Sequence, residues 1–309
     1  MPHLHSLEGL TLKNSWLTIG VFDGVHRGHQ SILQQLTAGA HASGAPAVVI
    51  SFHPHPASVL AKLTIPCLTS PAERAELLMA LGVEYVITLP FSRELAAQSP
   101  EKFMAAVAAP LGLRQLLIGY DFALGKNRAG TPERLTQIGK ELGYETRLLP
   151  AIQAGGEILS SSRARALLQG GEVGLAADIL GRFYTLTGPV VPGDGRGRTI
   201  GIPTANIDFP AEKLLPAYGV YACRALVGAK SHPAVVNIGL RPTFSSGDPA
   251  PRVEAHLLDV SADFYGQPMT LEFIQRLRGE QKFDSAAALV AQIHADIERT
   301  RAVKELQRL

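Results

Sequence analysis

Short apolar segments alternate with amphipathic ones through the first part of the chain. Residues 16–22 are apolar and partly β-branched, and Ile32, Leu33 and Leu36 follow at helical spacing. Further apolar runs cover residues 47–52, 85–89 and 116–119. The alternation predicts β-α-β units and a parallel sheet, and the near-continuous apolarity of the strands predicts burial on both faces.

A polar segment follows each of these predicted strands. The segments cover residues 20–29, 53–56, 90–93 and 120–125. Parallel strands share one carboxyl edge, and ligands of open α/β folds bind at that edge. We therefore expect the four loops to converge on one crevice.

The first of these loops carries two histidines where a helix is predicted to begin. His26 and His29 lie beside backbone N–H groups that no carbonyl satisfies. Two imidazoles at this spacing can face one ligand, and Gly28 between them allows a nucleotide backbone to approach closely. A single histidine near a strand end is more often a structural residue, but the whole arrangement predicts a phosphate site.

The later loops are more ambiguous. Pro54 and Pro56 would hold their segment extended, so His53 and His55 either contact a ligand or are simply solvated. These two histidines alone make a weak metal site. Residues 121–130 combine an acid, an aromatic ring, glycines and bases, which suits recognition of a polar ring and phosphates, or a surface turn.

Hydroxyl groups and arginines stand together in residues 160–165. The serines suit the N-cap of a helix, and Arg163 and Arg165 fall in its first turns. Arginine at that place opposes the helix macrodipole, so it needs either exposure or a compensating anion. A phosphate group is the attractive candidate.

The chain changes character near residue 183, where a helical pattern ends and short segments broken by glycine and proline begin. We place a domain boundary there. The strands predicted beyond it cover residues 219–227, 234–238, 252–259 and 269–274. They indicate an antiparallel sheet or small barrel, followed by a closing helix over residues 284–305 that is capped by Asp284 or Ser285.

Three segments of this second half are candidates for chemistry. Residues 188–198 are rich in glycine and base, which suits binding of a polyphosphate by backbone N–H groups, or an exposed hairpin. Thr204 and Asn206 project to one side of an extended segment and could hold a metal–phosphate unit, or belong to a proline-led turn. Glu254 is a candidate base if the sheet closes on a ligand, and a solvent-facing residue otherwise.

Composition narrows the classes of function. The 309 residues suffice for two domains, and the net charge of +2 with no long run of one sign demands no nucleic-acid partner. The N-terminus lacks a signal pattern, and no segment approaches a membrane span, so we expect a cytoplasmic protein. Cys67 and Cys223 lack metal-site spacing and are expected to be reduced and packed.

Taken together, these motifs resemble the bacterial bifunctional riboflavin kinase/FAD synthetases. The first half is similar to the FMN adenylyltransferase module, related to HxGH nucleotidyltransferases, at residues 20–30, 52–56, 68–69, 91–95, 99–101, 119–130 and 160–165. The second half is similar to the riboflavin kinase module at residues 193–206, 219–221, 237–244, 253–259, 264–266 and 277–283. Departures from the family pattern occur at Ser51, Thr131, Ser162, Phe183 and Gly279.

The resemblance implies a fold and two reactions. Residues 1–183 would form a Rossmann-like HxGH nucleotidyltransferase domain, and residues 184–309 a small antiparallel β-barrel of riboflavin kinase type with a closing helix. The barrel would phosphorylate riboflavin to FMN with ATP, and the first domain would adenylylate FMN to FAD and release pyrophosphate. ATP, Mg²⁺ and flavins are thus the expected ligands, with no nucleic-acid or membrane partner, and self-association stays open.

The resemblance also implies the roles of individual residues. Glu254, His26 and His29 are expected to be catalytic, and Thr204 and Asn206 to bind the metal. Binding of nucleotide or flavin is expected of Gly20, Phe22, Asp23, Gly24, Gly28, His53, Pro54, His55, Pro56, Asp121, Phe122, Gly125, Arg128, Ser161, Ser162, Arg163, Arg165, Gly193, Arg196, Gly197, Arg198, Pro203, Asn237 and Arg278.

Two other functions compete with this interpretation. An adenylyltransferase for another phosphorylated cofactor would share the histidine motif, but it would not need the kinase-like motifs at 193–206 and Glu254. A flavin-binding sensor or carrier without turnover would need neither the base nor the histidine pair.

Overall fold

The structure is a computed structural model that describes residues 2–61, 63–120, 122–150, 153–154, 157–195, 197, 200–240, 251–260 and 262–307. The chain divides into two compact units, Met1–Ser161 and Ser162–Leu309. Each unit has its own hydrophobic core and is described by itself.

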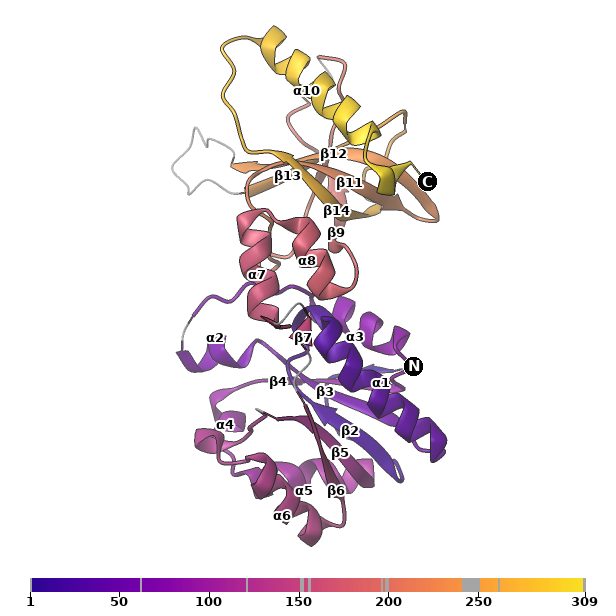
Figure 1. Cartoon of the computed structure of the whole chain (residues 1–309), viewed down its shortest axis with the longest axis vertical. Helices are drawn as coiled ribbons and strands as arrows, with labels where there is room; N and C mark the ends of the chain where they lie inside the picture. Colours follow the sequence, from indigo (N-terminus) through magenta and orange to yellow (C-terminus); the bar gives the residue numbers. More distant parts are fainter. Residues whose placement is uncertain are drawn as a thin grey trace. The chain divides into compact units, whose positions relative to one another are not determined.

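A six-stranded parallel sheet with the order β1-β4-β3-β2-β5-β6 forms the centre of the first unit (Figure 1). Its strands are β1 (His3–Leu4), β2 (Ser15–Ile19), β3 (Ala47–His53), β4 (Tyr85–Pro90), β5 (Leu113–Gly119) and β6 (Glu145–Leu149). The four predicted strands are confirmed. The sequence did not indicate the edge strands, because β1 has only two residues and β6 exposes three of its five.

Helices cover both faces of this sheet (Figure 1). Leu17, Val48 and Leu116 pack toward α5 (Pro100–Leu111) and α6 (Pro132–Leu142). The side chains that alternate with them pack toward α1 (Arg27–Ala42) and α3 (Pro71–Ala80) on the opposite face. The strands are therefore apolar at successive positions because both of their faces are buried.

Short elements follow the strands at their carboxyl ends. They are η1 (Asp23–Val25), α2 (Pro56–Ala61), α4 (Arg93–Ala96) and η2 (Lys126–Arg128). Because the strands are parallel, these elements stand at one edge of the sheet, as the sequence predicts. A small antiparallel hairpin of β7 (Gln153–Ala154) and β8 (Glu157–Ile158) precedes the end of the unit.

The second unit is a closed antiparallel barrel with the order β10-β13-β12-β11-β14-β9. Its strands are β9 (Tyr184–Val191), β10 (Ala205–Ile207), β11 (Gly219–Val227), β12 (Lys230–Leu240), β13 (Pro251–Leu257) and β14 (Pro268–Arg278). The predicted barrel is confirmed, and β9 and β10 complete it.

Helix α10 (Ala286–Arg301) lies across the barrel, followed by η3 (Lys304–Leu306) (Figure 1). Ser285, one of the two predicted caps, accepts a hydrogen bond from the Ala288 N–H at 3.1 Å. Ile293 and Ile297 pack the helix against the core of the unit. The predicted closing helix is thus present.

Two further helices precede the barrel, α7 (Ser161–Gly170) and α8 (Val173–Leu180). The Leu168 carbonyl accepts a hydrogen bond from the Ala217 N–H at 2.9 Å, and α8 packs on β9 and β14. These contacts group the helices with the barrel, although the change in sequence pattern lies near residue 183. The division of function at that residue stays a prediction.

Cys67 and Cys223 are free and buried, as expected. Burial raises the pKa of the Cys223 thiol well above its ordinary value. Among the described residues, no helix combines the length and apolar character that a membrane crossing requires.

Candidate active sites

The histidine motif lies in a tightly turned segment between β2 and α1. Phe22 and Val25 adopt left-handed backbone conformations, with φ of 52° and 40°. Such a conformation is costly for a β-branched residue, so the surroundings must hold it in place. His26 is the N-cap of α1, and its Nδ1 accepts a hydrogen bond from the His29 N–H at 3.3 Å.

The two imidazoles stack on each other. Their ring centroids are 3.6 Å apart, and the ring planes meet at 22°. The Phe22 ring packs against His29 at 4.9 Å. A Cβ at Gly28 would lie 3.0 Å from two atoms of the His26 ring. A glycine at position 28 therefore makes room for the His26 ring, before any ligand is considered.

Burial and charge keep His29 neutral. Burial lowers the pKa of His29 well below its ordinary value of 6.5, and the charges of His26 and Arg74 lower it further. The buried Nδ1 of His29 has no hydrogen-bond partner among the residues that the structure describes. A neutral imidazole keeps one N–H donor and one acceptor, so His29 can donate a hydrogen bond to an anion without itself carrying charge.

Asp23, predicted to bind the ligand, directs its carboxylate into the protein. It accepts hydrogen bonds from the backbone N–H groups of Leu68 and Thr69, both at 3.0 Å. Only 2% of the side chain is exposed, and Arg74 lies 3.7 Å away. Arg74 is not among the site residues predicted from sequence, although it stands four residues before the buried Leu78, on the helix face that enters the core.

The loop after β3 is connected to its neighbours through the backbone. The His53 carbonyl accepts a hydrogen bond from the Phe91 N–H at 3.0 Å, which joins the loops after β3 and β4. His55 Nδ1 accepts a hydrogen bond from the Ala57 N–H at 3.1 Å. Pro54 between the histidines is exposed. Both histidines thus stand at the carboxyl edge, and their contact with a ligand stays a prediction.

The loop after β5 is packed onto α5. A Cβ at Gly125, where φ is 74°, would lie 3.0 Å from Pro100. Phe122 packs against the core of the unit, and Arg128 is exposed with a φ of 58°. Asp121 lies outside the described residues.

The serine and arginine segment begins at α7. Ser161 Oγ donates a hydrogen bond to the Asp23 carbonyl at 2.8 Å, which ties Ser161 to the histidine turn. Ser162, Arg163 and Arg165 follow in the first turns of α7. Their contact with phosphate stays a prediction.

In the barrel, the strand register brings the predicted residues of the second site together. Asn206 on β10 pairs with Glu254 on β13, and Glu254 pairs with Asn237 on β12. These three residues and Thr204 line one cavity of about 590 Å³. The neighbours of Glu254 on β13 alternate with it and are buried, so Glu254 faces this cavity.

The same cavity receives a guanidinium from β14. Arg278 Nε donates to Asp296 Oδ2 on α10 at 2.9 Å, and Asp296 Oδ1 accepts from Gln292 Nε2 at 3.0 Å. The guanidinium also stands over the Phe283 ring, 5.7 Å from its centroid. Asp296, whose side chain is 1% exposed, is not among the site residues predicted from sequence.

The glycine-rich segment folds onto Thr204 and Asn206. A Cβ at Gly193 would collide with the Asn206 amide. A Cβ at Gly197 would collide with the Ile202 carbonyl and lie 3.4 Å from Thr204 Oγ1. Arg196 and Arg198 lie outside the described residues.

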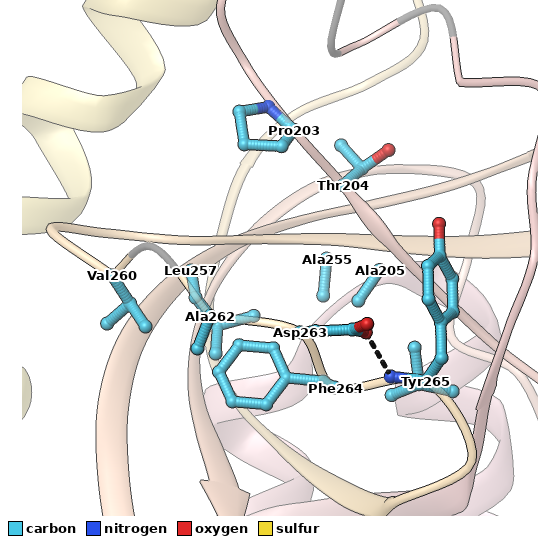
Figure 2. A pocket seen from close by; sticks show the side chains of 11 residues that line it. Pro203, Thr204, Ala205, Ala255, Leu257, Val260, Ala262, Asp263, Phe264 and Tyr265 are labelled. Carbon is cyan, nitrogen blue, oxygen red and sulfur yellow. Dashed lines mark hydrogen bonds between the residues drawn. The ribbon is translucent and has the colours of Figure 1, made fainter.

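A second cavity of about 550 Å³ adjoins Thr204, which lines both cavities. Pro203 also lines it, and Figure 2 shows the Phe264 and Tyr265 rings at its wall. Asp263 Oδ1 accepts a hydrogen bond from the Tyr265 N–H at 3.0 Å, which fixes this turn. The remaining lining is apolar and comes from β9, β10, β13 and the segment that follows β13.

The donors beside Glu254 suit a hard cation. Hydroxyl, amide and carboxylate oxygens are the ligands that Mg²⁺ prefers. Within the described part of the chain, the side chains of Thr204 and Asn206 make no hydrogen bond. The residues present therefore fit Mg²⁺, the ion that the resemblance implies.

A histidine turn at the carboxyl edge of a parallel sheet and a carboxylate–amide row on a closed barrel are features that a two-domain, nucleotide-dependent transferase would need. Residues 10–163 match the FAD synthetase family, and residues 180–304 match the riboflavin kinase family. The chain belongs to the bifunctional riboflavin kinase/FMN adenylyltransferase family, and the prediction made from the motifs is confirmed.

Relatives of that name match nearly the whole chain. The one from Pseudomonas fluorescens is 36% identical over 287 residues, covering 93% of this chain and 92% of its own. The one from Escherichia coli K12 is 36% identical over 296 residues, covering 95% and 94%. The Bacillus subtilis protein is 34% identical over 300 residues, covering 96% and 94%.

A solved structure has the same fold over the same extent. It is described as a macrolide-efflux protein from Streptococcus pneumoniae, with a TM-score of 0.89 and 29% identity over 98% of this chain and 99% of that one. The match concerns the fold, whereas the relatives and both families carry the assignment to riboflavin kinase and FMN adenylyltransferase.

Proposed function

We propose that the two activities are divided between the two halves of the chain. The chain is an enzyme that phosphorylates riboflavin and adenylylates FMN. In the proposed division, the adenylyltransferase occupies residues 1–183 and the kinase residues 184–309. The order of the two family matches along the chain supports it.

Glu254 is the proposed base of the kinase step. It accepts the proton of the riboflavin 5′-hydroxyl as that oxygen attacks the γ-phosphorus of ATP, and ADP leaves. The cavity that it lines also contains Ile293, Leu289 and Phe283, which suit a flavin ring. The adjoining cavity would bind the adenine of ATP. Thr204 lines both cavities, so the phosphoryl group would be transferred from ATP to riboflavin near this residue.

Thr204 and Asn206 would hold Mg²⁺ with the ATP phosphates, and the ion, when bound, neutralises phosphate charge. Gly193 keeps the Asn206 amide in place through close packing. Arg278, held by Asp296, offers its guanidinium to the substrate in the same cavity. These residues thus accelerate phosphoryl transfer by positioning the substrates and by stabilising the charge of the phosphates.

His26 and His29 serve the adenylyl transfer. An FMN phosphate oxygen attacks the α-phosphorus of ATP, the bond to the β-phosphate breaks, and pyrophosphate leaves. The backbone N–H groups at the start of α1 attract the phosphates, and the stacked imidazoles donate to the charge that develops. Neither step requires a covalent intermediate on the enzyme.

The proposed setting is the cytoplasm, with small-molecule substrates and without nucleic-acid or membrane partners. Two free, buried thiols and a net charge of +2 support this assignment.

The observation that carries the kinase assignment is the row of Asn206, Glu254 and Asn237 across three strands. Two variants test the division of labour, with flavins resolved by chromatography after incubation with ATP and Mg²⁺. Glu254→Gln should leave riboflavin unphosphorylated while converting supplied FMN to FAD, and His29→Ala should accumulate FMN. Equal loss of both reactions in a folded variant would refute the assignment.

A further inference from the structure

A buried arginine lies beneath the histidine turn. Arg74 is 2% exposed, and its Nη1 donates to Ser51 Oγ at 2.9 Å and to the Phe52 carbonyl at 3.3 Å. Its Nη2 donates to the Thr69 carbonyl at 3.2 Å and lies 3.7 Å from Asp23 Oδ1. A buried charge is tolerated only when it is paired and hydrogen-bonded, and Arg74 meets both conditions.

The Thr69 hydroxyl connects this arginine to the turn. It accepts hydrogen bonds from the Gly24 N–H at 3.0 Å and from Arg74 Nε at 3.5 Å. It donates to Asp23 Oδ1 at 3.1 Å. One donor and two acceptors are all that a hydroxyl offers, so Thr69 is fully engaged.

These contacts join three segments that are distant in sequence. Asp23 and Gly24 belong to the turn, Thr69 precedes α3, and Ser51 lies near the end of β3 and donates to the Val21 carbonyl at 2.9 Å. The turn itself contains left-handed Phe22 and Val25. Backbone strain of this kind persists only where the surrounding structure over-determines the conformation.

We propose that Thr69 and Arg74 are positioning residues for adenylyl transfer, which fix the turn so that His26 and His29 stack at the start of α1. The inference rests on the proposed function of the two histidines. With 2% of each residue exposed, Thr69 and Arg74 act through the turn and not by contact with substrate.

Thr69→Val is the central variant, because it keeps the volume and removes the hydroxyl. A displacement of about 1 Å can cost about 100-fold in rate, so we expect kcat for FAD formation from supplied FMN to fall by about 10- to 100-fold. Thr69→Ser keeps the hydroxyl and should restore most of the rate. Thr37→Val is the matched control, since the Thr37 hydroxyl is also buried but bonds only within α1.

Riboflavin phosphorylation in the same variants reports on the other activity of the chain and should not change. Arg74→Lys provides a second variant: it keeps the cation but cannot make all the guanidinium contacts, and it should also lower the kcat of FAD formation. If Thr69→Val does not fold, the rates of FAD formation by Arg74→Lys and Thr69→Ser test the proposal instead.

A double variant separates positioning from general stabilisation. If Thr69 acts through the histidines, Thr69→Val should lower the residual rate of His29→Ala much less than it lowers the wild-type rate. An equal fold-loss in both backgrounds, or wild-type FAD formation by folded Thr69→Val or Arg74→Lys, would overturn the inference. A wild-type rate in His29→Ala itself would instead refute the proposed function.

Discussion

Gly28→Ala should disrupt the histidine pair through a single added methyl group. The new Cβ would lie 3.0 Å from Cε1 and Nδ1 of His26, while its distance to the Leu159 Cβ would be an ordinary 3.7 Å. The His26 ring must therefore move, and it is stacked on His29 at 3.6 Å. Because Nδ1 is also the acceptor that caps α1, the displacement weakens the cap and the stack together.

The energetic balance of this substitution can be estimated from its parts. Alanine is favoured over glycine inside a helix by about 0.8–1.0 kcal/mol. Against this, loss of an N-cap side chain costs about 1 kcal/mol, and overpacking a buried site costs about 1–3 kcal/mol. The costs exceed the gain, so Gly28→Ala should destabilise the first unit by about 1–3 kcal/mol.

The assay is FAD formation from supplied FMN and ATP, with unfolding by urea measured in parallel. The His26 ring must give by a few tenths of an ångström. Because a displacement of about 1 Å can cost about 100-fold in rate, we expect kcat to fall by about 3- to 10-fold, while riboflavin phosphorylation is unchanged. Gly174→Ala on α8 is the matched control, since a Cβ there meets nothing within 4 Å. Wild-type FAD formation by Gly28→Ala would refute the reasoning.

Two further predictions concern the barrel site. Asp296→Ala leaves the Arg278 guanidinium without its buried partner, so unfolding of the second unit should become easier by about 3–5 kcal/mol, measured by urea denaturation. Asp296→Asn keeps an oxygen acceptor for Arg278 and should lose less stability. An unchanged urea midpoint in Asp296→Ala would contradict a stabilising role for the Arg278–Asp296 pair. Gly193→Ala should displace the Asn206 amide and lower riboflavin phosphorylation at least tenfold while FAD formation from supplied FMN continues, because its Cβ collides with that amide. A wild-type kinase rate in this variant would show that the close packing is not needed.

The local part of each site was predictable from sequence. His26 and His29 stand in a strand–turn–helix pattern that needs no distant residue to define it, and Thr204 and Asn206 stand two residues apart. Periodicity does not decide the role of Glu254. Its side chain alternates with apolar neighbours whether it faces a ligand or faces solvent. Its place in the cavity follows from pairing with β10 and β12, which lie far away in the chain.

The supporting residues could not be predicted in the same way. Asp23 is predicted to bind the ligand because it lies in the motif, yet its carboxylate accepts hydrogen bonds from backbone N–H groups about 45 positions later. Arg74 becomes recognisable only when the fold brings Ser51 and Asp23 to it. Asp296 carries no local signal either, since Arg278 meets it only after α10 folds back on the barrel.

The central claim is that two separate sites act in succession, the barrel first and the histidine turn second. The most direct test mixes purified His29→Ala and Glu254→Gln chains with riboflavin, ATP and Mg²⁺, and follows the flavins by chromatography. Neither variant alone should make FAD from riboflavin, whereas the mixture should make it through free FMN. A mixture of folded variants that yields no FAD, or a single variant that forms FAD from riboflavin at the wild-type rate, would contradict the claim.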